Sequence, residues 1–320
     1  MRLSLSTNWC NRRLATGEEI ADKALELGFD ELELGFHTPA DQVPGFRSRL
    51  DRMPVGSVHA YCPVPISAPC GYPELYTLAS FDEDARALAR FHVKRNAEFA
   101  AEMGADTVVL HAGRVSFAGF LVGRNFTSGT LRAALQKAQG DVKAKRYARL
   151  LAKAKRRRRE RGARLLDVFK RELEALFPDL ERLGVVLALE NLPYLEGFPD
   201  EAEMAEIAAA YPDAPVKAWF DTGHHRVRES HGWLAAPAEP KAEGEEPSAV
   251  APPPRGMHLN DVVDFNDDHL APGFGKVDFA ALADMARASR HVVFEPNGGV
   301  SEEDLAKGVS LIRLLWPDKA

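Results

Sequence analysis

The sequence predicts an α/β fold of the (β/α)8 barrel class, in which eight parallel strands alternate with helices and close into a cylinder. Short β-rich runs alternate with helical patterns along nearly the whole chain, and there are eight such runs. The other arrangement of this pattern is an open doubly wound sheet, but no G-x-G-x-x-G motif follows the first strand, so a dinucleotide-binding fold has little support. The 320 residues, of which 45% are hydrophobic, suit one large barrel domain spanning residues 1–320.

Several of the segments between the expected strands have a helical pattern. The amphipathic segment Glu18–Leu27 follows the first strand and stops at Gly28, and a long helix over Asp82–Met103 stops at Gly104. The strands, in chain order, are Leu3–Ser6, Glu31–Leu34, Val55–His59, Thr107–His111, Val185–Glu190, Val216–Asp221, Met257–Asp261 and Val292–Glu295.

Two segments interrupt this alternation and are expected to be insertions. The first, about residues 120–165, comes after the fourth strand, is rich in helix formers and contains the run KAKRRRRER at 153–161. We interpret it as a solvated helical excursion rather than a nucleic-acid-binding arm. The second, about residues 235–255, lies between the sixth and seventh strands and is rich in Ala, Pro and Glu without periodicity, which predicts a surface loop.

The net charge of −6 hides an uneven distribution along the chain. Residues 143–171 hold fourteen Lys and Arg against two acids, a local charge of +12, so the remainder of the chain carries −18. An acidic body repels the phosphate backbone of nucleic acids, whereas a basic helix attracts it or mediates contacts between subunits of a homo-oligomer. The charge therefore favours a small-molecule substrate and leaves nucleic acid as the alternative partner.

The cysteines and the hydropathy pattern bear on the compartment. Cys10, Cys62 and Cys70 are too few for a disulfide framework and indicate a reducing environment. No apolar run reaches the length of a membrane span, and the N-terminus lacks the hydrophobic core of a secretory signal. We therefore expect a cytoplasmic protein with no membrane partner.

Ionisable residues gather where the expected strands end. In a parallel barrel these ends meet on one face, which is where active sites are built. One strand contains His258 and leads to Asp267 and His269. Five other strands finish with His59, His111, Glu190, Asp221 and Glu295. Imidazoles and carboxylates without a cysteine predict a site for one to three divalent ions of Zn, Mn, Co or Fe.

Some of these residues also have a purely structural interpretation. Glu190 closes the apolar run VVLALE, where a buried carboxylate needs a partner, either a Lys or Arg or a metal ion. Asp221 and His224 lie three residues apart across Gly223. Either both point into the cleft, or Asp221 caps the next helix and leaves His224 on the surface.

The remaining candidates are histidines and one amide. His59 and His111 bind a metal, bind substrate, or hydrogen-bond to a neighbouring strand. Strand alternation places His258 and Asn260 on one face, and a spacing of two residues suits Asp267 and His269 as ligands of one ion. The candidates for contact with the substrate are His59, His111, His224 and Asn260.

In these motifs the sequence resembles the xylose-isomerase-like TIM barrels. That superfamily comprises sugar and sugar phosphate isomerases and epimerases and the endonuclease IV-type AP endonucleases (AP endonuclease family 2). The resemblance covers nearly the whole chain outside the two insertions. It rests on Val58-His59-Ala60, Leu110-His111-Ala112-Gly113, Leu189-Glu190-Asn191, Phe220-Asp221-Thr222-Gly223-His224, His258-Leu259-Asn260-Asp261 and Asp267-Asp268-His269, followed by Gly273 and Gly275.

The resemblance implies two arrangements of metal ligands. In the isomerases and epimerases one divalent ion is held by the residues that match Glu190, Asp221, His258 and Glu295, and the two glutamates act as acid and base. The endonuclease branch binds three zinc ions, of which the second lies on those same four residues. The first and third ions would then lie on His59, His111 and Glu190 and on His224, Asp267 and His269.

Two enzymatic functions follow from this resemblance. The first is a divalent-metal-dependent isomerase or epimerase that acts on a sugar, sugar phosphate or related polyol by metal-assisted proton transfer, with Glu190 and Glu295 as the catalytic residues. The alternative is a multinuclear zinc phosphodiesterase similar to endonuclease IV. A barrel that only binds a ligand is the third hypothesis, and lyase or hydrolase chemistry on the same scaffold stays open. Because the early loops show no basic and aromatic set for opening a duplex, we favour the sugar enzyme with a carbohydrate-like substrate.

Overall fold

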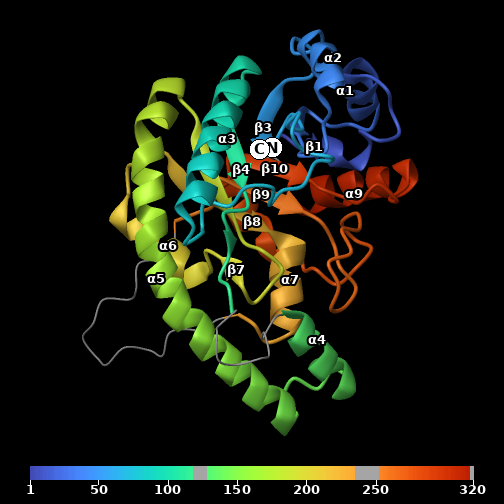
Figure 1. Cartoon of the computed structure of the whole chain (residues 1–320). Helices are drawn as coiled ribbons and strands as arrows, with labels where there is room; N and C mark the ends of the chain where they lie inside the picture. The colour runs from blue at the N-terminus through green and yellow to red at the C-terminus, as the bar shows by residue number, and fades with distance from the viewer. Residues whose placement is uncertain (118–127, 235–251, 318–320) are drawn as a thin grey trace, which may run out of the picture.

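The structure is a computed structural model that describes residues 1–117, 128–234 and 252–317. Eight parallel strands pair in the order β1-β10-β9-β8-β6-β4-β3-β2 and close into a barrel (Figure 1). They are β1 Ser4–Ser6, β2 Glu31–Leu34, β3 Val55–His59, β4 Thr107–Leu110, β6 Val186–Glu190, β8 Val216–Asp221, β9 Gly256–Leu259 and β10 His291–Phe294. The predicted barrel class is therefore confirmed, and each expected strand is present with its ends shifted by no more than two residues.

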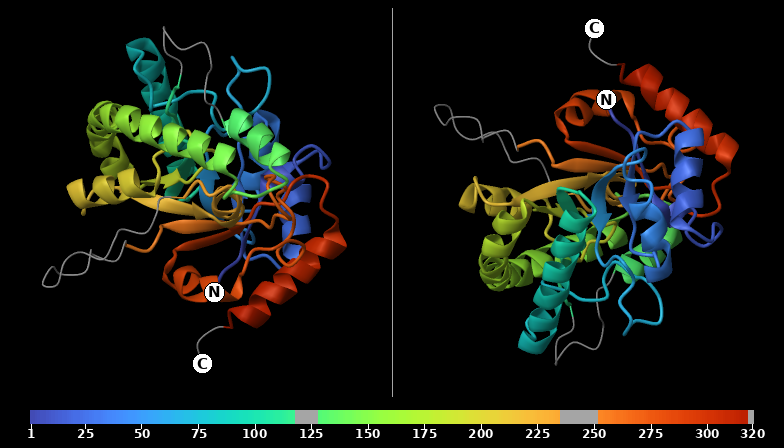
Figure 2. Two further views of the ribbon diagram at one scale, coloured as in Figure 1. Left: turned by 90° about the horizontal axis from the view of Figure 1, so that it is seen from below. Right: turned by 90° about the horizontal axis from the view of Figure 1, so that it is seen from above.

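Helices surround the barrel, as both views of Figure 2 show. They are α1 Gly17–Glu26, α2 Val43–Arg47, α3 Glu83–Glu102, α4 Ser128–Lys137, α5 Lys145–Leu183, α6 Glu201–Ala210, α7 Thr222–Ser230, α8 Ala283–Ala288 and α9 Glu302–Leu315. Short 3-10 turns lie at η1 Thr7–Trp9, η2 Ala40–Gln42 and η3 Ala280–Leu282, and a two-stranded antiparallel sheet joins β5 Gly113–Arg114 to β7 Gly197–Phe198. Among the described helices, none has an apolar stretch long enough to cross a membrane.

Local sequence signals explain where the two helices predicted in detail begin and end. Thr16 and Glu19 form a reciprocal capping box at the start of α1, and the Asp82 side chain accepts hydrogen bonds from the first backbone N–H groups of α3. Gly28 and Gly104 follow the two helices with φ of 86° and 77°, a left-handed conformation that glycine adopts without strain.

An apolar layer divides the barrel interior into two polar ends. Val109, Ala188, Trp219 and Val293, from four different strands, form this buried layer. A Cβ on Gly256 would lie 2.3 Å from the Trp219 ring, so the glycine makes room for the indole. Since every second residue of a strand points to the same side, the residues two positions before and after the layer also point inward, towards opposite ends of the barrel.

The basic insertion packs more tightly than the predicted solvated helix. Its first part consists of α4 and the first turns of α5, which lie next to each other (Figure 1). This part forms a second apolar cluster with Phe117, Leu195 and Trp233 from segments that follow β4, β6 and β8. Within the basic run, Arg158 is buried and pairs with Glu203 at 2.5 Å. The interpretation as a solvated excursion is thus wrong for this face of the helix, because the guanidinium binds a carboxylate of α6 and backbone carbonyls instead of water.

Parts of both predicted insertions lie outside the described residues. These are residues 118–127 of the first insertion and 235–251 of the second. The helix of the first insertion is also longer than expected, since α5 continues without a break to Leu183 and packs on α3 in its second half.

Candidate metal centre

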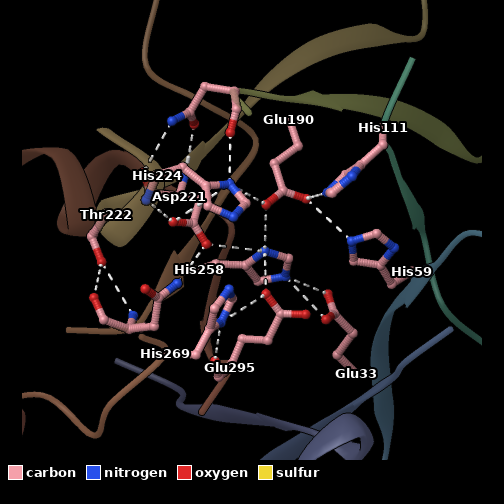
Figure 3. Close-up of polar contacts among 12 residues, drawn as sticks. Glu33, His59, His111, Glu190, Asp221, Thr222, His224, His258, His269 and Glu295 are labelled. Carbon is pink, nitrogen blue, oxygen red and sulfur yellow. Dashed lines mark hydrogen bonds and ion pairs between the residues drawn. The ribbon is translucent and has the colours of Figure 1, made fainter. Parts of the chain in front are cut away.

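The candidate ligands stand directly above the apolar layer, at the carboxyl end of the barrel. Strand alternation explains the positions of four of them, because each of the four comes two residues after a member of that layer. His111 follows Val109, Glu190 follows Ala188, Asp221 follows Trp219, and Glu295 follows Val293. His59 at the end of β3 and His258 on β9 complete the ring around the barrel axis (Figure 3).

Glu190 is the centre of the constellation. Its carboxylate is buried, and Oε2 lies 3.1 Å from Nε2 of His59 and 3.1 Å from Nε2 of His111 (Figure 3). The other oxygen, Oε1, lies 3.2 Å from Nδ1 of His258 and 3.3 Å from Nδ1 of His224. Glu190 therefore joins the predicted first group, His59 with His111, to the predicted second group.

The second group surrounds Nδ1 of His258. This nitrogen lies 3.3 Å from Oε2 of Glu295 and 3.9 Å from Oδ2 of Asp221, in addition to its contact with Glu190. Each of these four residues offers one ligand atom, and the four atoms lie within 4.8 Å of one another. Ligand atoms at such separations can each bond to one central zinc or manganese ion, since bonds from nitrogen or oxygen to zinc are about 2.0–2.2 Å long.

The third group lies at the outer edge of the second. His224 donates from Nδ1 to the carbonyl of Asn191 at 2.8 Å, which leaves Nε2 3.4 Å from Oδ2 of Asp267. His269 donates from Nδ1 to the carbonyl of Glu295 at 2.8 Å and places Nε2 3.3 Å from Oδ1 of Asp267. These two backbone contacts fix which nitrogen of each ring faces the carboxylate.

The Asp221–His224 turn combines both interpretations of its sequence. Asp221 caps α7, because Oδ1 accepts a hydrogen bond from the backbone N–H of His224 at 2.6 Å. The His224 side chain is nevertheless buried within the centre rather than on the surface. A Cβ on Gly223 would lie 1.7 Å from Oδ1 of Asn260, so only glycine fits between them.

Asn260 holds Asp221 in place. Its Nδ2 donates to Oδ2 of Asp221 at 2.6 Å, and the residue is fully buried. All nine predicted metal ligands are thus brought together in the structure. Their binding of metal, and the contact of His59, His111, His224 and Asn260 with substrate, stay predictions.

Glu33 is a member of the centre that the sequence analysis missed. Its oxygens lie 3.0 and 3.2 Å from Nε2 of His258, and Ser57 donates to one of them at 2.8 Å. The signal in the sequence was the alternation Glu31-Leu-Glu33-Leu. In a barrel strand the leucines pack against the surrounding helices, so the glutamates at every second position point into the barrel. Glu74, 3.7 Å from Nδ1 of His111, comes from a loop without such periodicity.

The centre is rich in negative charge. Five buried or partly buried carboxylates face five imidazoles, and among the described residues no Lys or Arg pairs with any of these carboxylates. The carboxylates are Glu33, Glu190, Asp221, Asp267 and Glu295, and the imidazoles are His59, His111, His224, His258 and His269.

The pKa values show how strongly the two sets of groups interact. Burial raises the pKa of Glu190, but the charges of His258 and His111 outweigh it and hold that pKa well below 4.5. Burial lowers the pKa of His111, but Glu190 overcomes it and raises the pKa to about 9. For Asp221, burial and the charge of Glu190 raise the pKa to about 6. Without an ion, protons on the imidazoles balance the carboxylates, and this is the role that a bound cation takes over.

The residues fit divalent transition-metal ions. Imidazole nitrogens and carboxylate oxygens without thiolates suit zinc, manganese, cobalt and iron. Because no Lys or Arg among the described residues pairs with the five carboxylates, a bound cation is the natural source of the positive charge that balances them. A cavity of about 400 Å³, partly lined by Glu295 and His269, lies beside the centre and has the volume of a small-molecule site.

Comparisons with known proteins agree with the fold. A family model described as "Xylose isomerase-like TIM barrel" matches residues 21–314. Among curated proteins, no match is found. The 3-keto-D-glucoside 4-epimerase YcjR from E. coli, in its apo form, superposes with a TM-score of 0.62 at 15% identity, over 98% of this chain and 99% of that chain.

Two further solved structures are similar over nearly their whole length. A D-tagatose 3-epimerase-like protein has a TM-score of 0.58 at 18% identity and covers 98% of this chain and 97% of its own. A protein from Thermus thermophilus, soaked with ZnCl2, has a TM-score of 0.55 at 21% identity and covers 100% of this chain and 98% of its own. At such identities the similarity shows the barrel fold.

Proposed function

The chain belongs to the xylose isomerase-like TIM barrel family, and from this premise we propose that it is a divalent-metal-dependent isomerase or epimerase acting on a sugar, a sugar phosphate or a related polyol. The proposal is supported by solved structures of similar fold that are described as sugar epimerases, among them D-psicose 3-epimerase in the presence of D-fructose. Its mechanism rests on the chain's own residues.

One observation carries the proposal: two glutamates approach the same candidate ion position. Glu190 and Glu295 come from different strands, and each has an oxygen within 3.3 Å of Nδ1 of His258. One glutamate would remove a proton from a carbon of the substrate, and the other would return a proton to it. Glu190, Asp221, His258 and Glu295 would hold a divalent ion, whose positive charge would stabilise the negative charge that develops on the substrate oxygens.

The neighbouring residues prepare these carboxylates for proton transfer. The pKa of Glu190, held well below 4.5 against burial by His258 and His111, keeps this side chain ionised at neutral pH. Asn8 donates from Nδ2 to Oε1 of Glu295 at 3.2 Å and so fixes the orientation of that carboxylate. Because one glutamate keeps the proton it removes and the other supplies the proton that replaces it, the new proton comes from solvent, and in D2O the sugar gains deuterium.

Exchange of substrate hydrogen with solvent tests the proposal. The chain loaded with Mn²⁺ or Zn²⁺ is incubated in D2O with a panel of ketohexoses, including D-fructose and D-tagatose, and deuterium in the sugar is followed by NMR. We expect incorporation that falls by about 10²–10⁴-fold in Glu190→Gln and Glu295→Gln, the usual contribution of a general acid or base. Undiminished exchange in both variants contradicts the assignment, and Glu31→Gln, at the other end of the barrel, is the matched control.

A second function is favoured by one specific observation. The groups His59–His111–Glu190 and His224–Asp267–His269 adjoin the four-residue group, although a single-ion isomerase needs neither of them. Three ions would suit a multinuclear zinc phosphodiesterase of the endonuclease IV type. Elemental analysis together with incision of an abasic-site duplex decides between the two: three ions per chain with incision support the phosphodiesterase, and one ion without incision supports the isomerase.

A further inference from the structure

We propose that the cavity beside the metal centre binds a phosphate monoester group of the substrate through Arg12 and Arg13. This inference rests on the proposed function and narrows its substrate class from sugars in general to small phosphorylated polyols. It concerns the loop after β1 and the loop after β2.

The cavity is lined by two chemically different sets of residues. Glu295 and His269 of the metal centre line it, and so do Arg12, Arg13 and His37 from two loops at the start of the chain. Its volume of about 400 Å³ suits a molecule of monosaccharide size rather than a stretch of duplex. A polyol with one charged end would therefore place its hydroxyl-bearing carbons near the metal centre and its charge near the guanidinium groups.

Neither guanidinium has a carboxylate partner among the described residues. Arg13 lies over the ring of Trp9, 4.4 Å from its centre, and donates from Nη2 to the Trp9 carbonyl at 3.1 Å. Arg12 has its Nη2 3.5 Å from Nδ1 of His37. Since a guanidinium carries five N–H donors, most donors of both side chains remain available for a ligand in the cavity.

Arg12 and Arg13 are the permanent positive charges of the cavity, since no lysine and no other arginine among the described residues lines it. Burial and the charge of Arg12 lower the pKa of His37, so its imidazole is neutral at pH 7. Asn8 connects His37 to the metal centre, because it accepts a hydrogen bond from the backbone of His37 and donates one to Glu295. Charge-assisted hydrogen bonds from two guanidinium groups are the usual means of binding a phosphate dianion.

The arginines of a cavity at the other end of the barrel differ from Arg12 and Arg13 in their partners. This cavity has the same volume, about 400 Å³, and is lined by Arg2, Arg287 and Arg290. Each of those is paired with a carboxylate of the chain: Arg2 with Glu31 at 2.5 Å, Arg287 with Asp284 at 2.9 Å and Arg290 with Asp106 at 3.2 Å. The arginines beside the metal centre differ in lacking such partners.

The fold assembles a set that is not apparent along the sequence. Trp9, Arg12 and Arg13 come from one loop and Phe36 and His37 from the next, and all five line the cavity. Trp9, Arg12 and Arg13 are close together in the sequence, within WCNRR at 9–13, but only the fold adds Phe36 and His37 of the next loop to them. Two arginines beside a cavity of about 400 Å³ suit a small phosphorylated ligand better than a duplex.

Binding of inorganic phosphate to the full-length chain tests this assignment. Phosphate is titrated calorimetrically into the purified protein, with and without EDTA, so that phosphate bound to metal is recognised by its loss on chelation. In the presence of EDTA we expect Arg12→Gln and Arg13→Gln each to weaken binding by about 10-fold or more, the effect of removing one charge-assisted hydrogen bond. Arg290→Gln, in the opposite cavity, is the matched control and is expected to leave binding unchanged.

The outcomes separate this inference from the proposed function. Phosphate binding that is absent, or equal in the arginine variants and in the parent, overturns the inference even if the sugar exchange assay succeeds. Phosphate binding that depends on both arginines supports it even if that assay fails. An abasic-site duplex is titrated in parallel: weaker duplex binding in the variants with unchanged inorganic phosphate binding overturns the monoester assignment in favour of a phosphodiester.

Discussion

The two ends of the barrel interior neutralise their carboxylates in different ways. At the amino end, Asp106 pairs with Arg255 at 2.9 Å and with His291 at 2.8 Å, and Glu31 pairs with Arg2. At the carboxyl end, Glu190, Asp221 and Glu295 meet imidazoles, and no guanidinium group among the described residues pairs with them. Glu74, which contacts His111 from a loop, is the exception at this end and pairs with Arg114 at 2.6 Å. Only the apolar layer of Val109, Ala188, Trp219 and Val293 separates the two ends.

This difference distinguishes a structural charge pair from a site that accepts an ion. Arginine is permanently protonated, so the charge of a carboxylate paired with it is already neutralised, and the pair does not attract a further cation. Histidine is neutral near pH 7 when an ion replaces its proton, and its nitrogen then becomes a ligand. Buried carboxylates surrounded by imidazoles therefore indicate metal binding more strongly than the number of acidic residues does.

The largest loss of metal affinity is expected for a substitution at Glu190, because this residue belongs to two of the ligand groups. Glu190→Gln removes the charge that attracts the ion and leaves an amide within reach of four imidazoles. We expect affinity for Mn²⁺ or Zn²⁺ to fall by more than about 100-fold, beyond the 10–100-fold that loss of an outer partner costs. Competition with a chromophoric chelator measures this.

The matched control lies at the other end of the same interior. Glu31→Gln removes a carboxylate that pairs with Arg2 and is expected to leave metal affinity unchanged. Equal losses in the two variants would mean that metal affinity reports general stability of the barrel rather than a centre at its carboxyl end.

A smaller effect is expected at Glu33, which contacts the centre through His258. By accepting from Nε2 of His258, Glu33 directs Nδ1 towards Glu190 and Glu295. Glu33→Gln is expected to weaken metal binding by about 10–100-fold, typical for the loss of a carboxylate behind a ligating histidine. The same chelator competition measures it, and Glu33→Asp, which keeps the charge, should recover part of the affinity. A loss that is equal in Glu33→Asp and Glu33→Gln contradicts a role for the charge.

The barrel and most of its site were predictable because parallel strands leave a clear sequence signal. Buried on both faces, these strands appear as short apolar runs, and a His or acid at the end of such a run is conspicuous, as for Glu190 and Asp221. The path of α5 was not predictable, since its helix formers continue from the insertion into the barrel helix, and Pro178, a residue that usually ends a helix, lies within it. The positions of loop residues such as Arg12 and Glu74 relative to the metal centre were not predictable, because they depend on contacts with residues far away in the sequence.

The smallest expected effect concerns the amino end and is visible as a pH dependence. Burial raises the pKa of Asp106, but hydrogen bonds from His291 and Thr107 and the charge of Arg255 outweigh it, so that the pKa lies below 3.8 in the folded state. The stabilisation from these contacts is therefore present above about pH 4 and disappears as the pH falls through the lowered pKa. Because the Asp106 side chain is 33% exposed, we expect Asp106→Asn to lower the free energy of unfolding at pH 7 by only about 1 kcal/mol or less. Urea unfolding from pH 7 down to pH 3 should show the parent and the variant converging below pH 4. A difference that stays constant or widens in acid would show that Asp106 contributes by packing rather than by its charge, and the contrast between the two ends would then rest on the carboxyl end alone.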